Sequence, residues 1–212
     1  MLRKTYIEQI RRLIYGSQPA DDAEITVGLV NVWLDQAIAF AAKKNYTDSL
    51  QLDGVAYINN SFYSTFKGLA VTKNENNLYR VTLPQIPIGI GNDEGISTLE
   101  LKDSWSKKIS FPIVWLTQNQ VAYQRGMRTI PNKLLAYSQG EFVYIITPLD
   151  VTCYTATVTM VSGGTSTDLN STLNVPNDYL PMITDYLKTN LMFQRSVPVD
   201  NVNDGLDSIK NV

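Results

Sequence analysis

The stretch GIGNDEG at residues 89–95 has glycines at a spacing that could form a loop around a phosphate. Such a loop places its glycines between a strand and a helix, directs backbone N–H groups at the anion and usually adds a lysine or arginine. Here the central residues are Asp93 and Glu94, whose carboxylates would repel a phosphate, and a strand-like stretch follows. Pro84 and Pro87 lie just upstream. The pattern therefore favours a surface turn, in which glycine supplies a positive φ.

The acidic residues give no catalytic or metal-binding pattern. Asp93 and Glu94 are adjacent, and two adjacent acids are not a ligand set for a divalent metal. Asp21 and Asp22 stand in SQPADD, where a helix is expected to begin. Capping and the helix dipole explain this pair better than a role as paired catalytic acids.

Histidine is absent from all 212 residues, and Cys153 is the single cysteine. The usual general base and the commonest transition-metal ligand are therefore missing. Cys153 has no partner for an internal disulfide or a zinc cluster. The alternating run VTCYTATVTM around it favours a small buried residue of a strand over a nucleophile. We predict that the protein is not an enzyme and has no catalytic residues, no cofactor and no bound metal.

Three residues of the central region are candidates for contacts with other molecules. Trp105 lies in the charged turn DSWSKK, where a large aromatic side chain is a candidate anchor of a protein interface, or else is partly buried in its own domain. Arg125 and Arg128 lie near tyrosines in a stretch that could contact nucleic acid. A solvated loop, or an interface with an acidic neighbour, is the favoured interpretation of these two arginines.

The composition favours broad protein contacts over binding to nucleic acid or membrane. Apolar residues make up 44% of the chain and charged residues only 18%, and the formal net charge is -2. The charged fraction is below the usual quarter, and no basic field or polybasic run is present. The N-terminal stretch has no uninterrupted apolar segment, and no later segment approaches the ~20 apolar residues of a membrane span. We expect a protein that is made in a cytoplasm and used or assembled there.

The two ends of the chain have helical periodicity. Tyr6, Ile7, Ile10, Leu13 and Ile14 form one face of a first helix, which Gly16 ends. A second helix is expected to start at SQPADD, to carry an apolar stripe from Ile25 to Ala41 and to end near Lys43 and Lys44. A third helix carries Leu180, Ile183, Leu187 and Leu191 on one face. Pro181 is tolerated there if the helix starts at Asn177 or Asp178.

The middle of the chain reads as short strands separated by turns. GLAVTKNENNLYRVTL predicts a hairpin with NENN at its tip, and further strands are expected in ISTLELKD, KISFPIVWL, KLLAYSQGEFVYIITP and VTCYTATVTMV. VAYINNSFYSTF is compatible with a helix or a strand, with a slight preference for a strand. QNQVAYQRGMR is a candidate short helix, and SGGTSTDLNST is a small-residue linker.

We therefore predict an α+β fold in which the terminal helices pack together as a small helical domain. The predicted segments are a helical part (1–50), an inserted antiparallel β sandwich or barrel-like domain (51–164), a linker with the C-terminal helix (165–195) and an extended arm (196–212). The arm shows no periodicity and is expected to become ordered on a neighbouring molecule. Its predicted anchors are Val197, Val199, Leu206 and Ile209.

Five blocks, in the same order, resemble a structural protein of crAss-like and related Bacteroidota-infecting tailed phages. The blocks are YIEQIRRLIYGSQPADDAEITVGLVNVWLDQAIAFAAKKNY, INNSFYSTFKGLAVT, LPQIPIGIGNDEGIST, MRTIPNKLLAYSQGEFVYIIT and VTMVSGG. They cover roughly residues 1–164. The resemblance implies a ring (adaptor) protein of the head-to-tail connector, at the head–tail junction of the virion, assembled in the host bacterial cytoplasm.

The resemblance also implies the partners. Such proteins stack as a dodecameric ring beneath the portal, contact the portal protein and adjacent tail ring proteins, and extend the DNA channel into a short tail. Double-stranded DNA would pass without sequence-specific contacts, and no membrane is involved. The alternative is a β-domain binding module, an adhesin or baseplate-like fibre component that recognises a glycan or cell surface through Trp105 or Trp115. A hydrolase that uses carboxylates is a third, disfavoured hypothesis.

Overall fold

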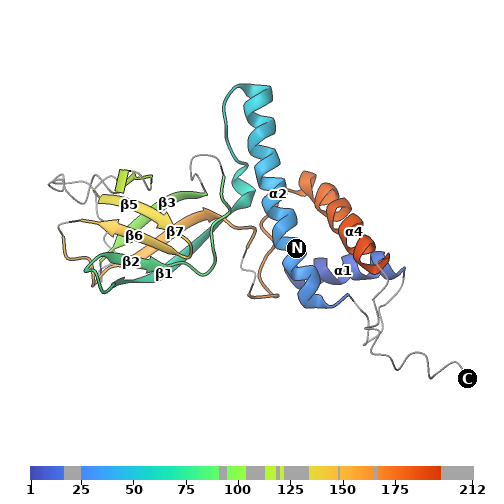
Figure 1. The fold of residues 1–212 in the computed structure, drawn as a ribbon, viewed down its shortest axis with the longest axis horizontal. Helices are drawn as coiled ribbons and strands as arrows, with labels where there is room; N and C mark the ends of the chain where they lie inside the picture. The colour runs from blue at the N-terminus through green and yellow to red at the C-terminus, as the bar shows by residue number, and fades with distance from the viewer. Residues whose placement is uncertain are drawn as a thin grey trace, which may run out of the picture.

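The computed structural model describes residues 1–16, 25–90, 95–103, 113–117, 120–121, 134–147, 149–164 and 167–196. The described helices are α1 (Arg3–Tyr15), α2 (Val27–Asp53) and α4 (Leu180–Ser196), with 3-10 turns η1 (Asn60–Phe62) and η3 (Asn177–Tyr179). The described strands are β1 (Tyr63–Lys73), β2 (Tyr79–Thr82), β3 (Ile96–Lys102), β4 (Ile113–Trp115), β5 (Leu134–Gln139), β6 (Phe142–Ile146) and β7 (Thr155–Val161). Helices at both ends of the chain enclose the strands in sequence, which confirms the predicted α+β class (Figure 1).

The strands form one sheet in the order β3-β7-β1-β2-β6-β5-β4. Its neighbouring pairs are antiparallel except β4 and β5, which run parallel with Ile113 opposite Leu134. The prediction of a purely antiparallel sheet is wrong for this pair. Residues 116–133 separate the two strands, and a connection of that length allows the crossover that parallel neighbours require.

The sheet bends into a nearly closed, barrel-like domain, as predicted. Leu99 and Leu101 come from β3 at one edge of the sheet, and Leu134 and Ala136 come from β5 near the other edge. All four side chains belong to the same buried cluster. Strands so far apart in a flat sheet share a core only when the sheet curls, so this β core indicates the barrel-like shape.

A second buried cluster joins the three helices. Ile7, Leu34 and Leu187, one from each helix, are all fully buried in it. Full burial of such a side chain contributes about 1.5–3 kcal/mol. The terminal helices therefore pack together, as the sequence predicts, and Figure 1 shows them on one side of α2 with the sheet on the other.

The helix α2 begins and ends later than the sequence predicts. Thr26 is its N-cap rather than a residue of SQPADD, and Thr26 Oγ1 accepts a hydrogen bond from Leu29 N–H at 3.2 Å. The helix passes Lys43 and Lys44 and ends at Asp53, and Gly54 follows with φ 69°. Lysine is compatible with a helix interior, and the sequence has no glycine or proline between positions 28 and 54 to stop the helix.

Two other local predictions are confirmed. The hairpin of β1 and β2 places Val71 opposite Val81, and Asn74 Oδ1 in its tip accepts hydrogen bonds from Asn76 N–H and Leu78 N–H at 3.0 and 2.9 Å. The helix α4 follows η3 directly, so Pro181 lies in the first turn, where its missing N–H would have no intrahelical acceptor.

The predicted linker packs tightly against the helical part. Gly163, with φ 65°, lies so close to α2 that a Cβ there would be 2.5 Å from Ile38 Cγ2. Farther along, Ser171 O accepts a hydrogen bond from Arg3 N–H at 3.0 Å. Thr172 forms an isolated antiparallel β-bridge with Leu2. Where it is described, the segment after β7 therefore joins the N-terminus to the rest of the helical part.

The contact of Gly163 with Ile38 gives a stability prediction. Gly163→Ala should lower the free energy of unfolding by about 1–2 kcal/mol because of the left-handed backbone. The overlap with Ile38 should add about 1–3 kcal/mol. Gly140→Ala is the matched control, because Gly140 has φ 60° and open space where a Cβ would lie. Urea unfolding of both variants measures the difference, and equal losses would contradict the packing argument.

Candidate interaction surfaces

The contact residues predicted from the sequence lie outside the described part of the chain. They are Trp105, Arg125, Arg128, Val197, Val199, Leu206 and Ile209. The acidic residues Asp21, Asp22, Asp93 and Glu94 and most of the candidate helix QNQVAYQRGMR also lie outside it. Trp115, which the glycan-binding alternative invoked, lies on β4 and packs, half-buried, against the β core.

The described residues on the two sides of the loop at positions 91–94 both hydrogen-bond to Val161 at the end of β7. Ile88 N–H donates to Val161 O at 3.0 Å, and Val161 N–H donates to Gly95 O at 2.8 Å. A Cβ at position 95 would overlap the carbonyl oxygen of Ile88, so glycine is required there for close backbone approach. Neither Gly89 nor Gly95 has a positive φ, so the expected reason for these two glycines is wrong.

A small pocket lies between this loop and the turn that joins β5 to β6. Its lining consists of apolar side chains, glycine backbone and one hydroxyl: Ile86, Pro87, Ile88, Gly89, Gly95, Ile96, Ser138 and Gly140. None of these lining residues is a lysine or arginine. The described part of the pocket therefore offers a phosphate no charged partner.

The prediction that Cys153 is a buried strand residue is wrong. Cys153 is exposed and lies in the turn before β7, which begins only at Thr155. Asp150 Oδ1 organises this turn by accepting hydrogen bonds from Thr152 N–H and Thr152 Oγ1 at 3.1 and 2.8 Å. These hydrogen bonds from Thr152 hold the pKa of the Asp150 carboxyl below its usual value.

Arg3 is fully buried although it is charged. Its guanidinium donates to Asn31 Oδ1 and Asp35 Oδ1 on α2, and its Nη2 also donates to Asn31 O at 3.2 Å. The Asp35 side chain is 42% exposed. Burial nevertheless raises the pKa of the Asp35 carboxyl, while the charge and hydrogen bond of Arg3 act in the opposite direction. The cluster is an ion pair that joins α1 to α2.

Tyr6 makes the corresponding polar contact between α1 and α4. Its hydroxyl lies 2.8 Å from Thr184 Oγ1. Burial raises the pKa of Tyr6, and the nearby charge of Asp185 raises it further, against the hydrogen bond with Thr184. Within the described ranges, no group of three or more His, Cys, Asp or Glu side chains is placed to hold a metal ion. The buried polar contacts of Arg3 and Tyr6 thus connect α1 to the other two helices.

The C-terminal end of α2 stands beyond the other helices and the sheet (Figure 1). Four large apolar side chains there are exposed, and they are termed the tip surface: Leu50 (48%), Leu52 (83%), Val55 (64%) and Tyr57 (52%). Single exposed apolar residues are ordinary, but four within eight residues make this end of α2 a candidate contact site. The sequence contained a signal for it, because Leu50 and Leu52 are two positions apart and cannot share one helix face.

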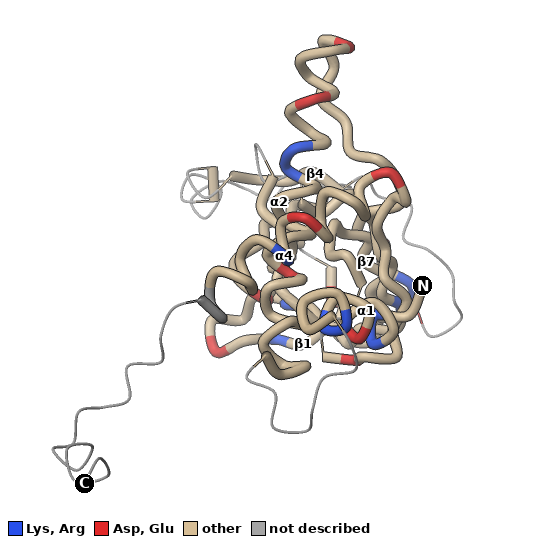
Figure 2. Tube along the Cα trace, turned by 90° about the vertical axis from the view of Figure 1, so that its right-hand side faces the viewer, with Lys and Arg blue, Asp and Glu red and all other residues tan. Residues whose placement is uncertain are grey.

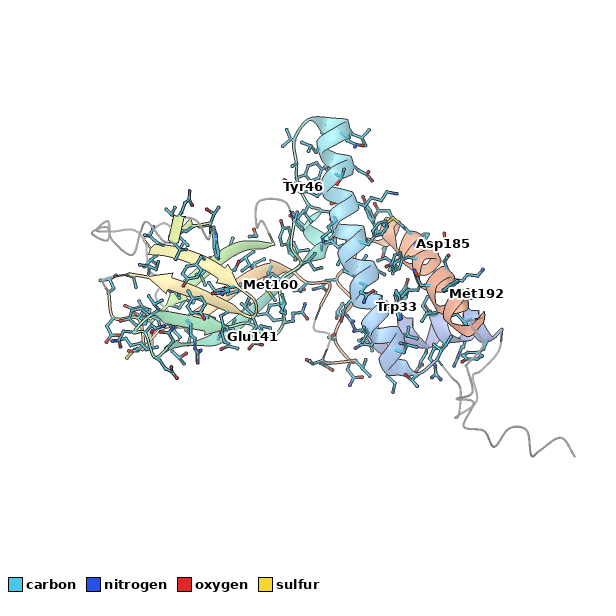
Figure 3. All side chains as sticks on the ribbon, viewed as in Figure 1. Trp33, Tyr46, Glu141, Met160, Asp185 and Met192 are labelled. Atoms are coloured by element: carbon cyan, nitrogen blue, oxygen red, sulfur yellow. The ribbon has the colours of Figure 1, made fainter. Side chains whose placement is uncertain are left out.

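A second exposed apolar region, termed the α4 surface, consists of Phe40, Tyr186 and Phe193. The rings of Phe40 on α2 and Tyr186 on α4 stack with centroids 5.5 Å apart. Phe193 follows Tyr186 by seven residues, hence on the same face of α4, and is 69% exposed. Met192, labelled in Figure 3, lies on the C-terminal part of α4 and is 44% exposed. This region lies away from the tip surface, toward the opposite end of α2 (Figure 1).

The outer face of the sheet carries an aromatic row with one cation. Tyr137 on β5 and Tyr144 on β6 are paired in register, and their rings stack with centroids 5.0 Å apart. The Arg80 guanidinium lies 5.0 Å from the centre of the Phe142 ring. A cation over an aromatic face stabilises the sheet by about 0.5–1 kcal/mol at a partly exposed site. These rings contact one another, so the row is in large part internal packing.

None of the helices in the described residues is long and apolar enough to cross a membrane. No protein-family model matches this sequence, and a comparison with curated proteins finds no similar sequence.

The Arg3 cluster gives a prediction about charge and hydrogen bonding. Because the pKa of Asp35 is raised in the folded protein, ionising this carboxyl costs more there than in the unfolded chain. Asp35→Asn, which keeps an oxygen acceptor for Arg3, should therefore lower the free energy of unfolding by less than about 1 kcal/mol. Asp35→Ala removes the acceptor as well and should cost about 1.5–3 kcal/mol, as for other hydrogen bonds to charged groups.

The raised pKa of Asp35 also predicts how the stability of the protein depends on pH. Because the folded pKa of Asp35 is raised, its stabilising contribution is fully present below the unfolded pKa of about 3.9 and is lost as pH rises through the folded pKa. The stability advantage of the wild type over Asp35→Asn should thus shrink as pH rises through that window. Urea unfolding of both proteins at several pH values measures this difference in stability. A difference that grows with pH would show that Arg3 affects the pKa of Asp35 more than burial does.

Proposed function

We propose that the protein is a non-enzymatic virion structural protein, a ring subunit in the head-to-tail connector of a tailed bacteriophage, where it extends the DNA channel. The observation that carries this proposal is the exposed tip surface on the projecting end of α2. The five sequence blocks that resemble connector proteins support the same conclusion. The partners of the proposed ring are further copies of this chain, the portal protein and adjacent tail ring proteins.

The placement of the apolar surfaces suits a ring. A cyclic assembly is built from head-to-tail contacts, so each subunit must present two different faces that complement each other. The tip surface and the α4 surface are two different apolar surfaces on separate parts of the helical region, which supports such an arrangement. A two-fold dimer would instead need a single self-complementary face.

The charge distribution suits a channel through which DNA passes. The net charge is -2, and Figure 2 shows basic and acidic residues at many separate positions on the chain. A protein that neutralises many phosphates binds DNA tightly, so a strongly basic channel would hinder passage. A nearly balanced surface supports a conduit without sequence-specific contacts.

The mass of the assembled species tests this proposal directly. Light scattering on the purified protein, alone and mixed with the portal ring of the phage, should show copies of the chain joining the portal at a fixed multiple. That multiple gives the copy number of the ring. A protein that stays monomeric and does not bind the portal would exclude the direct adaptor role.

Leu52→Glu tests whether the tip surface makes these contacts. Leu52 is 83% exposed, so the change should alter the free energy of unfolding by no more than about 0.5 kcal/mol. A carboxylate placed in an apolar interface should weaken assembly about tenfold or more. Leu149→Glu is the matched control, because Leu149 is an exposed leucine of the β domain (41%). Unchanged assembly of the Leu52 variant by light scattering would exclude the tip surface as an interface.

The glycan-binding alternative stays a prediction. Trp115, one of its two candidate stacking residues, packs against the β core. Binding of the purified protein to a glycan array would favour that alternative over a ring subunit.

A further inference from the structure

The projecting end of α2 combines exposed apolar side chains with negative charge. Residues 45–62 contain Asp48 and Asp53 but no lysine or arginine. Asp48 precedes Leu52 by four residues, and Asp53 follows Leu50 by three, so each leucine has a carboxylate beside it on the helix surface. Among the described residues, neither Asp48 nor Asp53 has an ion-pair partner. The tip surface therefore has an acidic rim.

The α4 surface has the opposite charge beside it. Its Phe40 is 48% exposed, and the exposed Lys43 and Lys44 follow by three and four residues on the same helix. Neither lysine has an ion-pair partner in the described part of the chain. On α4, the exposed Asp185 and Lys188 balance each other in charge. Figure 2 shows a basic position on α2 below the acidic positions of its projecting end. The exposed ring of Phe40 therefore has a basic rim.

The tip surface and the α4 surface of one chain cannot contact each other. Phe40 and Leu52 both belong to the continuous helix α2, which holds them about 18 Å apart along its axis. A contact between the two surfaces therefore needs a second molecule, and another copy of the chain presents both of them. Tip against tip would oppose carboxylates, and the α4 surface against itself would oppose lysines. Tip against α4 surface pairs opposite charges, which favours that combination.

We propose that the tip surface of one copy docks on the α4 surface of the next copy in the ring, with Asp48 and Asp53 facing Lys43 and Lys44. The proposal rests on the ring function proposed above and names the two faces that a ring subunit needs. Apolar side chains form the centre of this contact and the charges form its rim, the usual arrangement of a protein interface. The contact is head-to-tail, since the two surfaces are different parts of the chain.

Reversal of one charge on each surface tests the pairing. Asp53→Lys should weaken assembly about fivefold, because an attraction at the rim becomes a repulsion. Lys44→Glu should weaken assembly by a similar factor for the same reason. The double variant with both changes again places opposite charges across the contact, so it should assemble within about twofold of the wild type. Light scattering at low salt, where surface charges are least screened, measures assembly alone and on the portal ring.

A reversal elsewhere on the chain is the matched control. Glu75 is exposed in the hairpin tip between β1 and β2, and Glu75→Lys changes the net charge by the same amount as Asp53→Lys. Glu75→Lys should not affect assembly and should not rescue Lys44→Glu. A rescue as complete as that by Asp53→Lys would make net charge the cause and overturn the proposal. Asp53→Lys and Lys44→Glu variants that assemble as well as the wild type would also overturn it.

Crosslinking shows which surfaces meet. In a Cys153→Ser background, one population carries Gln51→Cys beside the leucines of the tip surface, and a second, with a different tag, carries Thr189→Cys on α4. Both positions are exposed, and a short bis-maleimide added to the mixed assembly should join the two populations. Thr72→Cys on β1, also exposed, replaces Thr189→Cys as the control and should give few crosslinks. Crosslinks between two Gln51→Cys chains as frequent as those between positions 51 and 189 would show tip-to-tip packing and overturn the proposal.

The outcomes separate this contact from the ring function itself. If the intact protein assembles at a fixed multiple, but the charge reversals and the crosslinks give no effect, this contact is wrong while the ring stands. If the intact protein forms no assembly, alone or with the portal, both the ring and this contact are wrong. A closed pair of copies joined by crosslinks between positions 51 and 189 would place the contact within a dimer and overturn its role between successive ring subunits.

Discussion

The fold of the helical region depends on the buried guanidinium of Arg3. A charge removed from water must be paired and hydrogen-bonded, and Arg3 finds its partners on α2, at Asn31 and Asp35. Its backbone N–H meanwhile donates to Ser171 O, in the segment that follows β7. One residue near the N-terminus thus fixes the positions of α1, α2 and the return from the β domain. Together with the apolar core that α1, α2 and α4 share, these contacts leave the strands as an insertion between the terminal helices.

The helical and β regions are coupled by buried contacts. Phe62, in η1 directly before β1, and Val161, at the end of β7, are buried in the helical core rather than in the β core. The backbone N–H of Ser162 donates to Phe62 O, and Asn174 Nδ2 donates to Ser64 Oγ at 2.7 Å. Because both strands enter the helical core side by side, the sheet is attached to the helices through two adjacent strand ends. Such an attachment fixes the position of the sheet relative to the helices.

The sequence predicts local elements better than it predicts their ends and their surfaces. Periodicity identifies α1, the inward face of α4 and the hairpin of β1 and β2, because each depends on the spacing of apolar residues along a continuous stretch. The C-terminal end of α2 is missed because Lys43 and Lys44 favour a helix end without enforcing one. The parallel pairing of β4 with β5 is missed because it depends on the crossover between strands that are distant in sequence. Cys153 was assigned wrongly because the alternation of apolar and polar residues in β7 extends into the preceding turn. There Asp150 accepts a hydrogen bond from Thr152 N–H, and no strand is formed.

The candidate surfaces depend on exposure, which pattern alone does not give. The spacing of Leu50 and Leu52 shows that they cannot share one helix face, but only the extension of α2 past its packing partners shows that both are exposed. The buried side chains of α2 end with Asn45 and Ser49, and Asn45 holds the returning chain by accepting from Asn59 N–H and donating to Tyr179 OH. The buried contacts of α2 end at Ser49, before the tip surface begins, so the tip surface adds little to the stability of a single copy. Apolar side chains that remain in water lower the solubility of a protein. A second molecule that covers them removes this apolar area from water. The separation of a well-packed core from an exposed apolar end is therefore the physical basis for regarding the protein as a component of an assembly.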